Sequence, residues 1–175
     1  MSNHMLWSIN FANFHSRLKY GTVLWGRDGE IVEVFQLEEK VIWWITGVHK
    51  RESCWHIFRK FRILTLTSLY ILEMLCFMKE YEGNQKHGFG IHGHNTRNKF
   101  GLCTQYSSTV LYQRSATNMG IQLFNKLPVQ IKQVDSYKGF KREGKTFLLN
   151  NSFYMIWRIF WTLREYSNFT LGVSV

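Results

Sequence analysis

Residues 68–81 carry the feature that most constrains the fold, because this stretch is apolar on almost every side of a helix. A helix without a polar face has to be covered all round, so we expect it at the centre of a helical bundle. Thr65 or Thr67 is a candidate N-cap for it. Its apolar side chains are Leu69, Ile71, Leu72, Met74, Leu75, Cys76, Phe77 and Met78.

Segments before this central stretch have the pattern of covering helices. Apolar residues recur at three- and four-residue spacing over about 30–46, which predicts an amphipathic helix that ends at Gly47. A short helix is predicted over about 52–61. Helical spacing also begins near Phe11, whereas residues 20–25 are predicted to be extended.

Segments after the central stretch divide into a loop and two helices. Four glycines and little apolar periodicity over residues 83–93 predict a long loop, with an extended piece near 100–112. Ser115 is a candidate N-cap for a helix to about Lys126, and Ser136 for one over about 137–149 with Phe140, Phe147 and Leu148 inward. Ser152 is the candidate cap of a last segment, 153–166. No strand pattern is strong, so an all-α fold is predicted.

The positive charge is concentrated in the second half of the chain. The sequence has 22 Lys and Arg against 12 Asp and Glu, a formal net charge of +10. Residues 1–82 have a net charge of +1, and residues 83–175 have +9. A basic segment that is poor in acids favours a polyanionic partner, most often nucleic acid. Membranes and acidic proteins also bind basic surfaces, so charge alone leaves these partners open.

Several function classes are disfavoured by what the sequence lacks. It has two aspartates, Asp28 and Asp135, far apart, whereas metal-dependent phosphoryl transfer needs converging carboxylates. Phosphate-loop, dinucleotide-binding and nucleophile-elbow motifs are absent. Apolar runs stay below the length of a membrane span, and no signal peptide is expected. Three widely spaced cysteines indicate a reducing compartment, and so an intracellular protein of the nucleus or cytoplasm.

A family resemblance emerges when short motifs are taken in order over residues 15–156. The longest are HSRLKYGTVLWG at 15–26, ILTLTSLYILE at 63–73 and GIQLFNKLP at 120–128. In this order they resemble the C-terminal part of a reverse transcriptase from a jockey-like non-LTR retrotransposon. The same resemblance includes shorter matching pieces, at 45–47, 51–54, 94–97, 112, 115, 131–132, 140–141, 145, 147–149 and 152–154.

The resemblance implies a thumb-like, small irregular helical bundle with a long central loop and a C-terminal helical segment. Taken with the residue patterns, the predicted division of the chain is a thumb-like region at 11–82, a Gly/His-rich loop at 83–114, a basic helical region at 115–166 and a tail at 167–175. Such a region holds the template–primer, RNA or RNA–DNA duplex, while the palm performs RNA-directed DNA synthesis with Mg²⁺. The palm's acidic motif is not in this sequence, so the chain is expected to be a truncated remnant that is inactive alone.

The candidate nucleic-acid-binding residues are seven basic side chains that would touch the phosphate backbone without reading sequence. Four of them have spacings of three, one and three, which on a helix form one stripe. The alternative is an ordinary solvated helix face. The seven are Arg97, Lys99, Arg114, Lys138, Lys141, Arg142 and Lys145.

Other patterns carry less weight. His87, His92, His94 and Cys103 could together hold Zn²⁺, but their spacing matches no common finger, so no metal or other cofactor is predicted. The aromatic run at 153–161 suits packing better than an interfacial membrane helix. Two further interpretations of the whole chain stay open: a basic helical nucleic-acid-binding module that works alone, and the non-functional product of a pseudogene.

Overall fold

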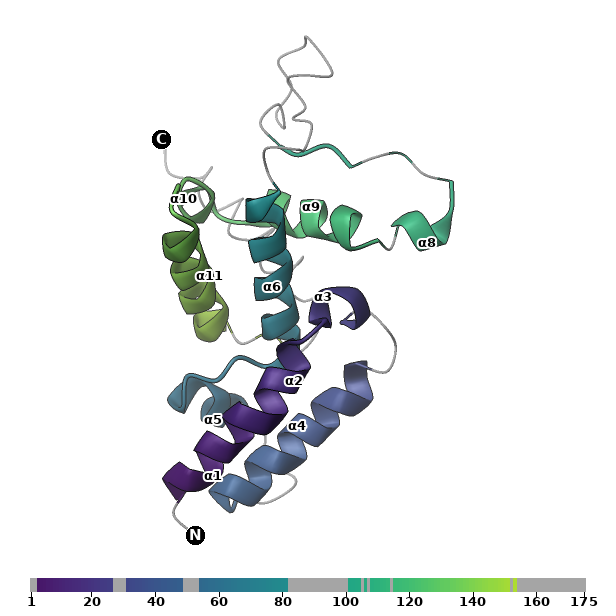
Figure 1. Ribbon diagram of the computed structural model, residues 1–175. Coiled ribbons are helices and arrows are strands. Elements are labelled where there is room, and N and C mark those ends of the chain that lie inside the picture. The colour runs from purple at the N-terminus through teal and green to yellow at the C-terminus, as the bar shows by residue number, and fades with distance from the viewer. Residues whose placement is uncertain are drawn as a thin grey trace, which may run out of the picture. The chain divides into compact units, whose positions relative to one another are not determined.

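The computed structural model (Figure 1) describes residues 3–26, 31–48, 54–81, 101–104, 106, 108–113, 115–151 and 153. These residues are mostly helical and contain no strand, so the predicted all-α class is confirmed for them. The chain divides into two compact units. The first contains residues 1–73 and 145–156, and the second contains residues 74–144 and 157–175. The predicted division into four regions stays a prediction.

The first unit begins with one uninterrupted helical run of three parts. α1 (Asn3–Ile9) passes into a π-helical turn, η1 (Asn10–His15), and then into α2 (Ser16–Lys19). Tyr20 is extended and Gly21 has a φ of 68°, a left-handed conformation that glycine adopts without cost, so the run ends there. π-Helical turns are rare and often lie at functional positions.

α3 (Thr22–Trp25) corrects the prediction of an extended piece at 20–25. Its residues form a helical turn because Gly21 reverses the chain and because Gly26 at its end packs closely on the fully buried Tyr70. A Cβ atom at Gly26 would lie 2.2 Å from Tyr70 Cδ2 and 2.5 Å from the Thr22 carbonyl oxygen. The β-branched Thr22, which favours strands, is buried in this helix.

Gly26→Ala is therefore expected to destabilise the protein by about 1–3 kcal/mol, because the added methyl group has no room. Urea unfolding followed by circular dichroism measures the loss. The double variant Gly26→Ala/Tyr70→Leu should show a smaller additional loss than Gly26→Ala does in the parent protein. An alanine at position 26 that leaves stability unchanged would contradict the close approach.

α4 (Ile31–Thr46) confirms the predicted amphipathic helix and packs against α1. Gly47 follows it with a φ of 70°, as expected of the residue that ends a helix. α5 (Trp55–Lys60) lies within the predicted 52–61 and ends in a Schellman motif at Arg62, whose φ is 54°. The side chains that pack here form one core cluster: Ile42, Cys54, Ile57, Phe58 and Ile63, joined by Trp7, Phe35, Trp43 and Val48.

α6 (Leu66–Glu80) confirms the predicted central helix, since nearly all its side chains are buried. Thr65 is its cap: the Thr65 hydroxyl oxygen lies 3.2 Å from the Ser68 backbone N–H that donates to it. The same hydroxyl donates to the Phe153 carbonyl at 2.5 Å, and the Phe153 N–H donates to Ser68 Oγ at 3.3 Å. These bonds attach the residue after the last helix to the beginning of α6. Cys76 is buried as predicted.

The second unit contains the end of α6, α8 (Val110–Gln113), α9 (Ala116–Lys126), α10 (Val129–Lys132) and the first half of α11 (Tyr137–Asn151), up to residue 144. Ser115 caps α9 as predicted, because its hydroxyl accepts the Asn118 N–H. α9 approaches α6 closely at Gly120, where a Cβ atom would lie 2.6 Å from Met78 Cγ. The prediction of an extended piece near 100–112 is wrong at α8, which is helical. Residues 101–104 are non-helical. There the Leu102 N–H donates to Asn125 Oδ1, and the Asn125 side-chain amide donates to the Leu102 carbonyl.

Candidate nucleic-acid interface

α11 forms where the sequence places it and buries the predicted face. The Ser136 hydroxyl accepts the Gly139 N–H at 3.5 Å and so caps the helix. Phe140 and Leu148 are fully buried, and Phe147 is half-buried with its ring 6.4 Å from that of Phe153. Apolar packing on one side therefore fixes which side of α11 meets the solvent.

The solvent side of α11 carries the predicted basic stripe. Lys138, Arg142 and Lys145 are exposed, and Lys141 is half-buried. Because they lie three, one and three residues apart on one helix, their cationic groups follow the helix axis. Glu143 is the acid beside them, with Oε1 3.3 Å from Arg142 Nε. Both side chains of that pair are well exposed, so it contributes little stability and leaves the stripe strongly basic.

Two further lysines of the second unit have structural roles. Lys132 Nζ donates to the Asn125 carbonyl at 2.8 Å, which holds α10 to the end of α9, and burial lowers the pKa of Lys132. Lys79 Nζ lies 5.7 Å from the centre of the Phe140 ring and donates to the Lys132 carbonyl at 3.4 Å. These ammonium groups are engaged inside the unit, so they are poorer candidates for phosphate contacts than the stripe.

The remaining predicted site residues lie outside the described part of the chain. These are Arg97, Lys99 and Arg114, together with His87, His92 and His94 of the zinc alternative. Cys103 is described and is a half-buried free thiol. Among the described residues, no three His, Cys, Asp or Glu side chains come together in a way that could hold a metal ion. No described helix has both the length and the apolar character needed to cross a membrane.

A buried polar pair in the first unit was missed by the sequence reasoning. Glu38 of α4 is 2 % exposed, and its Oε2 accepts the Leu66 N–H at the beginning of α6, 2.9 Å away. His15 Nε2 lies 3.8 Å from Glu38 Oε1 and 3.3 Å from the Leu64 carbonyl oxygen. Glu38 occupies an apolar-face position of α4, and that violation of the amphipathic pattern was the available signal.

Burial controls the protonation of this pair. Desolvation raises the pKa of Glu38 to about 8, although the Leu66 N–H acts in the opposite direction. Desolvation also lowers the pKa of His15, and the positive charges of Lys145 and Lys19 lower it further. Glu38 Oε1 has no hydrogen-bond partner within the described chain. Both groups are therefore neutral in the folded protein at pH 7. Because their folded pKa values differ from the ordinary ones, the free energy of unfolding changes with pH.

Comparison of the chain with protein families, with curated proteins and with solved structures finds no match in any of the three. The resemblance to a reverse transcriptase stays a prediction. Within the described residues, the surface feature that bears most directly on function is the basic stripe along the single helix α11.

Proposed function

We propose that this chain binds the phosphate backbone of nucleic acid through the basic stripe of α11, Lys138, Lys141, Arg142 and Lys145. The role we propose is that of a thumb-side region of a retrotransposon reverse transcriptase, which holds RNA or RNA–DNA duplex without reading its sequence. The observation that carries this proposal is the exposure of Lys138, Arg142 and Lys145 along one helix whose other side buries Phe140 and Leu148.

Several features support backbone contacts rather than base recognition. Phosphate contacts need cations at a helix surface and no shaped pocket, and α11 offers cations along its length. The chain has a formal net charge of +10, so it also attracts polyanions over longer distances. The sequence has no acidic pair of the palm type, so we expect no DNA synthesis by this chain alone.

A salt series tests the proposal. Fluorescence anisotropy with a labelled 16-mer should detect binding of single-stranded RNA, single-stranded DNA and RNA–DNA duplex of unrelated sequences. Log K should fall linearly with log salt, with a slope of about −3 to −4 if the four side chains each neutralise one phosphate of a duplex. Affinity that does not change between 50 and 300 mM salt, or that depends strongly on base sequence, would contradict backbone binding.

A polymerase assay tests the second half of the proposal. Purified protein with a primed RNA template, dNTPs and Mg²⁺ should incorporate no more nucleotide than a heat-inactivated sample does. Incorporation above that control would show a catalytic centre in this chain and refute the assignment of a holding role alone.

A further inference from the structure

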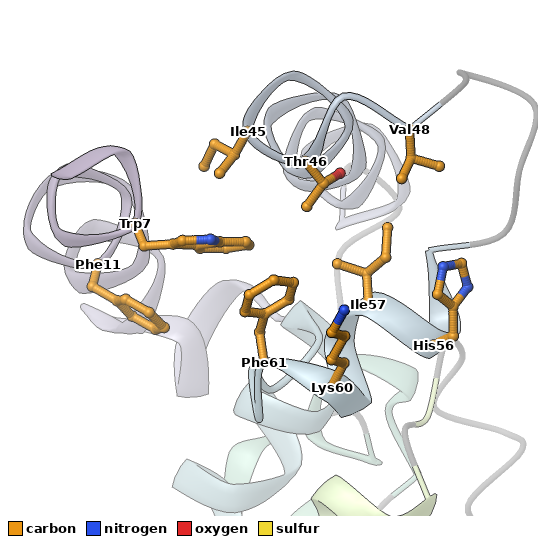
Figure 2. A pocket seen from close by; sticks show the side chains of 9 residues that line it. All are labelled: Trp7, Phe11, Ile45, Thr46, Val48, His56, Ile57, Lys60 and Phe61. Carbon is orange, nitrogen blue, oxygen red and sulfur yellow. The ribbon is translucent and has the colours of Figure 1, made fainter. Parts of the chain in front are cut away.

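A cavity in the first unit lies between the end of α4, α5 and the side of α1 (Figure 2). Its volume is about 570 Å³, which falls within the range of small-ligand sites. All of its lining residues belong to one compact unit.

The walls of the cavity suit a flat ring. Trp7 and Phe61 form an aromatic side, with ring centres 4.8 Å apart. Ile45 and Val48 face them from α4 and the residues that follow it, as Figure 2 shows, so the opposite side is aliphatic. Phe61 is 42 % exposed, so its ring is available to a ligand. Bases that are taken out of a stack are commonly held between aromatic and apolar side chains of this kind.

The polar groups of the cavity favour an anion. Lys60 extends its ammonium group between Ile57 and Phe61, with Nζ 5.8 Å from the centre of the Phe61 ring, and His56 lies on the same helix beyond Ile57. Among the described residues, the lining contains no Asp or Glu. Thr46 Oγ1 donates to the Ile42 carbonyl at 2.7 Å and lines the cavity without offering its hydroxyl hydrogen. The cavity therefore combines a place for a planar apolar group with a place for a negative charge.

We propose that this cavity binds a single unstacked nucleotide, with the base against Trp7 and Phe61 and the phosphate at Lys60. The choice of a nucleotide among aromatic anions rests on the proposed function, whereas the cavity and its charge do not. Few polar groups face the base, so purine and pyrimidine nucleotides should both bind, the purine somewhat more tightly because it stacks over a larger area. The site would hold one splayed nucleotide of a single strand.

Calorimetry with adenosine 5′-monophosphate, adenosine and ribose 5-phosphate tests this proposal with the full chain. The monophosphate should bind about three- to tenfold more tightly than adenosine, and ribose 5-phosphate should bind weakest, because base and phosphate are both recognised. Lys60→Gln should remove the difference between monophosphate and adenosine. Lys40→Gln, an exposed lysine of α4 outside the cavity, is the matched control and should change nothing.

A second variant separates stacking from charge. Trp7→Leu should weaken the binding of the monophosphate and the binding of adenosine by the same factor. Because Trp7 also packs on the core, the melting curve of this variant is measured first. If Trp7→Leu unfolds, Lys60→Gln alone tests the proposal. Three results would each overturn the proposal: equal affinities for the monophosphate and ribose 5-phosphate, a higher affinity for 1-naphthoate than for the monophosphate, or unchanged affinities in Lys60→Gln. Charge reversal of the α11 stripe should leave mononucleotide binding intact, so failure here is distinguishable from failure of backbone binding.

Discussion

Charge reversal at the three exposed cations of α11, Lys138→Glu, Arg142→Glu and Lys145→Glu, is expected to weaken binding to RNA–DNA duplex by about two to three orders of magnitude in 0.1 M salt. Each lost phosphate contact forfeits the release of about one counterion, and the new carboxylates add repulsion. The three side chains lie on the solvent side of the helix, so the variant should fold. Fluorescence anisotropy with one labelled duplex measures the change.

A control with the same change of net charge is available outside α11. Arg17, Lys40 and Arg62 are exposed and lie outside α11, so their reversal to glutamate tests long-range attraction alone. We expect this control to lose at most about tenfold in affinity, because a charge that does not touch the nucleic acid is largely screened at this salt concentration. Equal losses in both triple variants would mean that net charge, and not α11, accounts for binding.

Glu38→Gln is expected to stabilise the protein at pH 8 and to change the pH dependence of its stability. The folded carboxyl has a pKa of about 8, whereas an ordinary one has 4.5. Between these values the unfolded carboxyl ionises and the folded one does not, so the free energy of unfolding falls as pH rises, by about 5 kcal/mol in total. The amide keeps an oxygen for the Leu66 N–H and removes this titration.

His15 acts in the opposite direction over part of the range. Its pKa is lowered from 6.5, so below that pH the unfolded state binds a proton that the folded state does not, and stability increases with pH up to about 6.5. Above pH 6.5 the contribution of His15 no longer changes, so the parent protein loses about 2 kcal/mol between pH 6.5 and 8 from Glu38 alone. The charged groups that face the pair are Lys19 and Lys145, which lower the pKa of His15, and Glu39, which raises the pKa of Glu38.

Urea unfolding at pH 5, 6.5 and 8 checks this expectation. The parent protein and Glu33→Gln, an exposed acid of the same helix, should lose stability between pH 6.5 and 8, and Glu38→Gln should not. A Glu38→Gln variant that is less stable than the parent at pH 5 and 6.5, with a smaller difference at pH 8, would contradict the neutral pair, since that result is expected of a Glu38–His15 ion pair.

The helices could be predicted from the sequence wherever the capping residues and the apolar pattern agreed with the packing. Ser115, Ser136 and Thr65 cap α9, α11 and α6 because a hydroxyl before an apolar run satisfies backbone N–H groups whatever lies around it. The central position of α6 followed from its lack of a polar face.

Other features depend on contacts that distant parts of the chain make. Thr22 to Trp25 forms a helical turn because Gly26 meets Tyr70, a contact that no local pattern contains. α10 was not predicted from the sequence; Pro128, which follows the end of α9, is its N-cap residue. Glu38 and His15 lie 23 positions apart, so their pairing followed only from the packing of α1, η1 and α4.

The α11 stripe was predictable because it needs only helix geometry and an apolar opposite face, and three of its four members are exposed as the spacing predicted. The cavity at Trp7 was not predictable, because its walls come from three helices and its aromatic residues lie 54 positions apart in the chain. Sites assembled from several elements need the tertiary structure, whereas a site on one helix does not.

Lysine acetylation in the presence and absence of RNA–DNA duplex is the most direct measurement of where this chain meets nucleic acid. Mass spectrometry should show that Lys138 and Lys145 react several times more slowly in the complex, that Lys40 reacts at the same rate in both samples, and that 0.5 M salt abolishes the difference. Unchanged rates at Lys138 and Lys145 under conditions where the duplex is fully bound would contradict the assignment of α11 as the binding surface.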